Sequence, residues 1–263
     1  MAHPWTNVAF VSPHLDDAVL CCGATLSQLA QSGCSVSVIT VFAGLPPERL
    51  SEFAHTIHRK FGLTGDAVST RRTEDLSALR IIGAEPVHGH LLDAIYRPSR
   101  ASDWQFTDNE GIFDASRPLD DGTLQATCAF VEPLLHRIRP DVVFTCSAIG
   151  GHVDHRMVVA ALRCIWPPER TVYWEDLPYA CTTPPEAAYG RRDFFTEAAS
   201  PLAWERKREA LSQYRSQFGI LGTESAEFPD NVWIHARDSH GVVGLSEAGW
   251  RGTPGTYASE LLV

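Results

Sequence analysis

The sequence predicts an α/β fold in which a mostly parallel sheet is flanked by helices and carries its active site at the carboxyl edge. Short apolar runs, typical of buried strands, alternate along the chain with longer amphipathic runs typical of helices. Clusters of His and Asp follow two of these strands, at residues 14–17 and 152–155. Turns that follow parallel strands meet at one edge of the sheet, so we expect the two clusters to converge there.

The first half of the chain alternates strands and helices as parallel crossovers require. The second strand is apolar almost throughout, as in a strand covered on both faces. Two of the helices are followed by glycines that can end them. In chain order the expected elements are a strand at 7–12, a helix at 18–32, a strand at 34–42, helices at 48–61 and 69–82, and a strand at 86–92.

The second half opens with a polar segment, residues 94–122, that is rich in Asp, Gly, Pro and aromatic side chains. Loops of this length are uncommon without a function, so we interpret it as a lid-like insertion in a single domain spanning 1–263. Pro133 should kink or bound the helix that follows. The remaining expected elements are a helix at 123–139, a strand at 141–146, a helix from the 152–155 cluster to about 164, a strand at 171–174, a helix at 202–218 and a strand candidate at 231–236.

The composition is that of a soluble globular protein, with 263 residues, 44% hydrophobic and 21% charged. A net charge of -10 argues against nucleic acid as the main partner, because nucleic-acid binders carry a basic footprint. No apolar run approaches the ~18 residues of a membrane helix, so we expect no membrane span. Seven cysteines without a CxxC pair indicate the reduced thiols of a cytoplasmic protein rather than a Cys-based metal site.

A His and two Asp lie within four residues at the first strand-to-helix turn. His14 and Asp17 are spaced to bind one cation from that turn, and His155 of the second cluster can supply a third ligand. Three protein ligands and one open position are typical of hydrolytic Zn²⁺ sites, where the ion lowers the pKa of water and polarises a carbonyl. Asp16 is left to take a proton from water and pass it to the leaving group.

The second cluster supplies an oxyanion donor in this interpretation. His152 and His155 are three residues apart and share a face at the start of a helix. With His155 on the metal, His152 can donate to the oxyanion, and we expect Asp154 to hold it protonated. A second HxxH pair, His55 and His58, has no carboxylate cluster after a strand and is interpreted as a solvated helix face.

These motifs resemble the LmbE-like, or PIG-L, family of N-acetyl-amino-sugar deacetylases. The resemblance runs from about Asn7 to Leu162 and implies a Rossmann-like fold, a zinc ion and hydrolysis of an acetamido group. By motif position it implies the same ligands, base and oxyanion donor as above, and substrate contacts by Arg71 and Asp93. The matching stretches are Pro13-His14-Leu15-Asp16-Asp17, Arg71-Arg72-Thr73-Glu74, Leu91-Leu92-Asp93 and His152-Val153-Asp154-His155.

A closer resemblance is to the subgroup that deacetylates the N-acetylglucosaminyl unit of glycopeptide antibiotics. It rests on residues 11–19, 92–97, 148–150 and 174–179 and does not identify the acceptor. Some family members have a Tyr where this chain has Gly150, so another group must polarise the carbonyl if that Tyr does so. Many members read PHPDDE, and Leu15 and Ala18 depart from that pattern at positions that bear no ligand.

Other polar residues near the strand ends are candidates for substrate contact. His88 and His90 alternate on one face of a strand that leads to the same edge, and we expect His90 to line the pocket. Glu175, Asp176 and Tyr179 follow a strand, where both sugar contact and structural hydrogen bonding are open to them.

The predicted function is zinc-dependent hydrolysis of the N-acetyl group of a 2-acetamido sugar in a glycoconjugate or antibiotic precursor, releasing acetate and the free amine. One alternative is an amidase acting on a larger N-acyl group or a thiol conjugate. Another is a nucleotide-binding α/β protein, against which the acidic first turn and the lack of a GxGxxG motif after a strand argue. The expected partner is a small amino-sugar substrate, while iron or cobalt in the site and the oligomeric state stay open.

Overall fold

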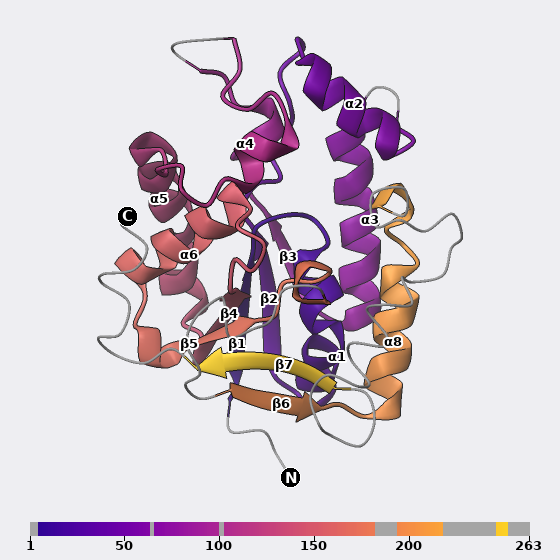
Figure 1. Cartoon of the computed structure of the whole chain (residues 1–263). Helices are drawn as coiled ribbons and strands as arrows, with labels where there is room; N and C mark the ends of the chain where they lie inside the picture. The colour runs from indigo at the N-terminus through magenta and orange to yellow at the C-terminus, as the bar shows by residue number, and fades with distance from the viewer. Residues whose placement is uncertain (1–4, 64–65, 100–102, 182–193, 218–245, 252–263) are drawn as a thin grey trace.

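In the computed structural model, seven strands form one sheet between layers of helices (Figure 1). The structure describes residues 5–63, 66–99, 103–181, 194–217 and 246–251. Its strands are β1 (Asn7–Ser12), β2 (Ser35–Thr40), β3 (Glu85–His88), β4 (Val142–Cys146), β5 (Thr171–Trp174), β6 (Phe194–Ala198) and β7 (Ser246–Arg251).

The sheet order is β3-β2-β1-β4-β5-β7-β6. The first five strands are parallel, and β7 pairs antiparallel with β5 and β6 at one edge. The chain moves outward from β1 to β3 and then returns to β4 on the other side of β1. This reversal makes the β1–β4 pair the switch point where open α/β sheets bind ligands. The predicted fold class is confirmed.

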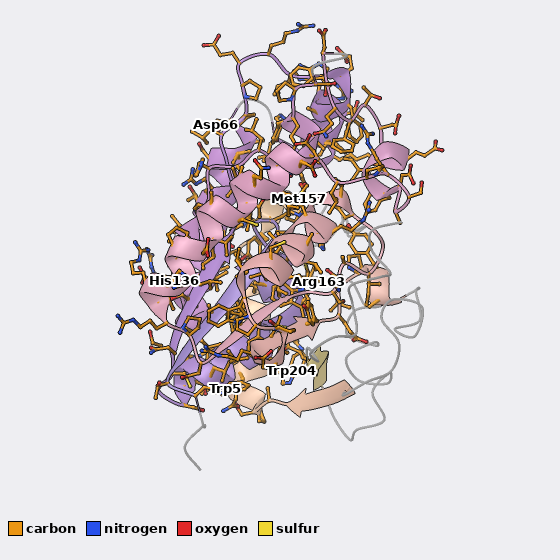
Figure 2. All side chains as sticks on the ribbon, turned by 90° about the vertical axis from the view of Figure 1, so that its left-hand side faces the viewer. Trp5, Asp66, His136, Met157, Arg163 and Trp204 are labelled. Atoms are coloured by element: carbon orange, nitrogen blue, oxygen red, sulfur yellow. The ribbon has the colours of Figure 1, made fainter. Side chains whose placement is uncertain are left out.

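Helices cover both faces of the sheet. α1, α3 and α8 pack together on one face, and α5 and α6 lie on the other (Figure 1). Figure 2 turns the α5–α6 face toward the viewer, with Met157 fully buried and His136 at the exposed end of α5. The bounds are α1 (Asp17–Gln31), α2 (Glu52–Lys60), α3 (Ala67–Ile82), α4 (Asn109–Phe113), α5 (Asp121–Ile138), α6 (Val153–Ile165) and α8 (Pro201–Leu211), with 3-10 turns η1 (Ala94–Tyr96), η2 (Pro168–Arg170), η3 (Tyr179–Cys181) and η4 (Arg215–Gln217).

The central strands are buried on both faces, which explains their apolar sequences. Phe10 of β1 stacks on Phe144 of β4 with ring centroids 4.5 Å apart, and Trp174 of β5 extends the stack at 6.2 Å. All three rings are almost inaccessible to solvent. This rigid packing fixes the ends of β1, β4 and β5, from which the site is built. Within the described residues no helix is long and apolar enough to cross a membrane.

The last strand of the described residues, β7, docks onto a break in α1. Cys22 has non-helical dihedral angles, so the backbone N–H groups of Ala24 and Thr25 are available to a partner. Both donate to the Glu247 carboxylate, at 2.9 and 2.7 Å, and Lys207 of α8 pairs with the same carboxylate at 2.5 Å. A buried charge pair thus joins β7, α1 and α8.

Several expected elements differ in the structure. The strands β6 and β7 were not predicted, and the candidate strand at 231–236 lies outside the described residues. The helix expected at 202–218 ends at Leu211, after which η4 forms. Pro133 was expected to kink or to bound its helix; it is not a boundary, because α5 continues through it with Val131 and Leu135 buried in the core.

Candidate active site

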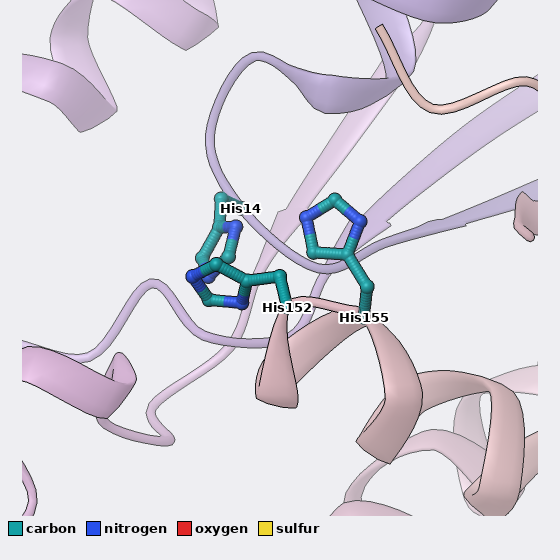
Figure 3. Close-up of side chains that lie close together, drawn as sticks. All are labelled: His14, His152 and His155. Carbon is teal, nitrogen blue, oxygen red and sulfur yellow. The ribbon is translucent and has the colours of Figure 1, made fainter. Parts of the chain in front are cut away.

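The two predicted clusters meet at the carboxyl ends of β1 and β4. The turn after β1 carries His14, and His152 and His155 come from the start of α6 on the other side (Figure 3). Their ring centroids are 4.9 to 5.3 Å apart. The imidazoles therefore line one small volume, as the sheet topology requires.

Two of the predicted metal ligands, His14 and His155, converge on a carboxylate oxygen of the third, Asp17. Asp17 Oδ2 lies 3.3 Å from His14 Nδ1 and 3.3 Å from His155 Nε2. All three side chains are buried. Two imidazoles and a carboxylate at this spacing are a donor set suited to Zn²⁺ or a similar transition-metal ion. His152 can also join the two histidines, since one ligand atom from each of the three lies within 4.8 Å of the others.

Each ligand histidine is held from behind by a second carboxylate. Asp154 Oδ2 lies 3.0 Å from His14 Nε2, and Asp176 Oδ1 lies 2.7 Å from His155 Nδ1. The opposite ring nitrogens thereby face Asp17. This is the carboxylate–histidine arrangement that orients metal ligands in many proteins. Asp176, whose contacts the sequence left open, thus lies directly behind His155 and also accepts from Ser147 and Ile149.

The charge balance of the site favours a cation. Burial opposes protonation of His14 and His155, but the surrounding carboxylates outweigh it and raise both pKa values, that of His14 to about 10. The negative field that would hold protons on these rings would equally attract a metal ion in their place. The donor atoms, their supports and the field all fit a bound divalent cation.

Asp154 does not hold His152 protonated, contrary to expectation. Its carboxylate is taken by His14, by the guanidinium of Arg97 and by the backbone N–H of Ala94. Only its backbone N–H reaches His152, donating to Nδ1 at 3.1 Å. Burial, followed by the charge on His14, lowers the pKa of His152 well below its usual value. The ring is then neutral with its proton on Nε2, which can still donate to an oxyanion.

Asp16 stands beside the donor set without belonging to it. Its φ of 133° is in a region that residues other than glycine rarely adopt, and its side chain does not cap α1. Such strain is characteristic of functional sites. Burial raises the pKa of Asp16 to about 7, with the Arg71 guanidinium opposing and the Asp17 charge adding to the shift. A carboxyl group with that pKa is suited to proton transfer near neutral pH.

Of the three expected substrate contacts, two lie at the site and one does not. Arg71 and Asp93 line the same cavity as Asp16, with Arg71 stacked over Phe61 at 4.9 Å. His90 is exposed, packs against Phe130 and is not among the residues that line the cavity. β3 ends at His88, so the alternation expected of a strand does not extend to His90, although Asp93 and Ile95 further along the chain line the cavity.

Another histidine expectation also needs correction. The pair at residues 55 and 58 is not simply a solvated face, since His58 is buried and its Nε2 lies 2.6 Å from the Tyr96 hydroxyl. His58 is buried on α2 next to Ile57, whereas His55 of the same helix is exposed.

A cavity of about 480 Å³ opens over the polar cluster. Its upper walls come from α2 and α4, which rise above the sheet in Figure 1. The segment 94–122 contributes to these walls. The apolar side chains that line the cavity are Leu20, Phe53, Ile57, Phe61, Ile95, Ile112, Phe113 and Leu177.

Tyr179 occupies the space beside Gly150. A Cβ at Gly150 would lie 2.7 Å from Tyr179 Cγ, and φ at Gly150 is +88°. Tyr179 also lines the cavity, 6.2 Å from the His155 ring by centroids. Sequence reasoning found both residues separately but had no signal for their contact.

The fold and site define an α/β protein with a His/Asp cation-binding centre and a separate acid beside it. Residues 9–166 match the family model described as PIG-L, GlcNAc-PI de-N-acetylase, and the chain belongs to this family.

Individual relatives agree with this assignment. The chain is 27% identical over 231 residues to the 2'-N-acetylparomamine deacetylase of Niallia circulans, which covers 82% of each protein. Among solved structures, the A40926 pseudoaglycone deacetylase Dbv21 superposes with a TM-score of 0.78 at 31% identity, covering 97% of this chain and 99% of that one. A zinc-inhibited form of the teicoplanin deacetylase Orf2 gives 0.78 at 32% identity, covering 93% and 97%.

Proposed function

We propose that this protein hydrolyses the N-acetyl group of a 2-acetamido sugar in an antibiotic precursor or related glycoconjugate, using zinc and releasing acetate and the free amine. The observation that carries the proposal is the convergence of His14 and His155 on Asp17, with Asp16 beside them but outside the donor set. The named deacetylases among its relatives support the reaction class.

The residues divide the reaction between them. A zinc ion held by His14, Asp17 and His155 would polarise the acetyl carbonyl and lower the pKa of the attacking water. Asp16 accepts the proton of that water and returns it to the departing amine nitrogen. The Nε2 proton of the neutral His152 ring donates to the oxyanion.

Substrate binding falls to the cavity above these groups. Arg71 and Asp93 offer a donor and an acceptor for sugar hydroxyls beside the base. The segment 94–122 contributes Ile112 and Phe113 to the cavity lining, which supports a role in covering bound substrate. The apolar walls also favour the second candidate, an amidase acting on a larger N-acyl group, because a longer acyl chain needs such a surface.

A panel of acyl donors separates these candidates. The purified protein is loaded with one equivalent of zinc, since excess zinc is to be avoided given the zinc-inhibited relative. It is then incubated with N-acetylated aminoglycoside, glycopeptide and glycolipid precursors and with their long-chain N-acyl counterparts. Loss of the acyl group is followed by mass. Preferential loss of acetyl supports the proposal, whereas preferential cleavage of long acyl groups favours the amidase and absence of both rejects hydrolysis.

A further inference from the structure

Gln217 brings a distant part of the chain into contact with the predicted base. It lies at the end of η4, outside the family-matched residues 9–166, and is 4% exposed. With its amide turned so that both atoms have partners, its nitrogen donates to Asp16 Oδ2 at 3.1 Å and its oxygen accepts from Arg71 Nε at 3.0 Å. A single amide therefore bridges the base and the neighbouring arginine.

The Gln217 amide contacts the Asp16 carboxylate directly, through a hydrogen bond. The closest approach of Arg71 is Nη2 to Oδ1 at 3.8 Å, too long for a hydrogen bond. Among the described residues, Gln217 is thus the donor at hydrogen-bonding distance from that carboxylate. The strained φ of Asp16 and the lack of a helix-capping bond leave its side chain no local anchor.

The segment that carries Gln217 is itself fixed to α3. The backbone N–H and hydroxyl of Ser216 donate to the two Glu74 oxygens at 3.0 and 2.6 Å. The Tyr214 hydroxyl donates to Asp75 Oδ1 at 2.7 Å. Because α3 also carries Arg71, one helix positions both the arginine and the segment that bridges it to the base.

We propose that Gln217 is a positioning residue that orients the Asp16 carboxylate for proton transfer, so that the C-terminal part of the chain completes the active site. The inference rests on the proposed function, in which Asp16 is the base. A displacement of a reacting group by about 1 Å can lower the rate roughly 10²-fold. We expect an effect of this size when the Asp16 carboxylate loses the hydrogen bond that orients it.

Two substitutions separate hydrogen bonding from packing. Gln217→Met keeps the volume and removes both bonds, and Gln217→Glu keeps an acceptor for Arg71 but removes the donor to Asp16. Both variants should lose about 10- to 100-fold in kcat, with KM changed less than about threefold and with zinc content and Tm retained. Gln213→Ala, a half-buried glutamine of the same segment that contacts Glu209 and Ser212, is the matched control.

The outcomes are distinct. A rise in KM with kcat unchanged would make Gln217 a substrate contact, and wild-type kcat in the Glu variant would show that donation to Asp16 is unimportant; either overturns the proposal. In an Asp16→Asn background the Met substitution should cost less than about twofold, because its partner is gone. If the parent protein releases no acetate, the proposed function fails. Crystal structures then still decide the positioning role, since the Asp16 carboxylate should turn in Gln217→Met and stay in Gln213→Ala.

Discussion

Replacing Asp16 by Asn tests the division between the metal ligands and the base. The Asn side chain is nearly isosteric with Asp and keeps a polar group next to Gln217. Its amide cannot accept a proton at neutral pH. Loss of a general base typically costs 10²- to 10⁴-fold, equivalent to about 2.7 to 5.4 kcal/mol of transition-state stabilisation. The donor atoms of His14, Asp17 and His155 do not involve Asp16, so zinc binding should persist.

The assay pairs acetate release with metal analysis. Asp16→Asn should lose turnover by the stated factor while binding one zinc per chain, as measured by atomic emission after dialysis. Asp17→Asn is the matched comparison, because Asp17 Oδ2 lies between both histidines and its loss should reduce zinc content. Normal turnover in Asp16→Asn, or loss of zinc from it, would refute the assignment of roles.

Three further outcomes follow from the same geometry. Asp16 can act as a base only when it is ionised, and its pKa is about 7. A bound cation would lower this pKa, so we expect the midpoint of the pH profile at or below pH 7. Below the midpoint, kcat/KM should fall about tenfold per pH unit as Asp16 becomes protonated. Asp176→Asn removes the carboxylate behind His155 and should weaken zinc binding 10- to 100-fold in a chelator competition. Gly150→Ala would place a methyl group against the Tyr179 ring at a residue whose φ is +88°. The variant should therefore have a Tm several degrees lower in thermal unfolding, and a second substitution, Tyr179→Ala, should partly restore it.

The sequence predicted the centre of the site because its signals are local. A turn that follows a buried strand and carries a His and two Asp must place them at the sheet edge, and a helix start aligns residues three apart. These rules alone bring His14 and Asp17 to His155, and parallel pairing of β1 with β4 completes the contact. The strand order thus brings the two short motifs together in one cluster.

The remaining features depend on lateral contacts that no short motif encodes. Asp154 was expected to serve its neighbour His152, but the helix start directs its carboxylate toward Arg97 and His14 instead. Gln217 reaches Asp16 from η4, a turn that is distant in sequence and is bonded to Glu74 of α3 through Ser216. His90 was expected to face the pocket because side chains alternate along a strand. The strand β3 ends at His88, so this rule does not apply to His90.

The polar centre and most of the cavity walls come from different elements. The proposed metal ligands and the proposed base come from strand ends and helix starts fixed by the central stack, where a small displacement would disturb the core. The cavity walls come from α2 and from residues 94–122, which pack in a second apolar cluster around Tyr96 and Phe106. That cluster also contains Leu15 and Val153, which lie within the two His/Asp motifs. A substitution at Ile57 or Ile112 would alter the walls, whereas one at Leu15 or Val153 would also disturb the turns that carry the polar residues.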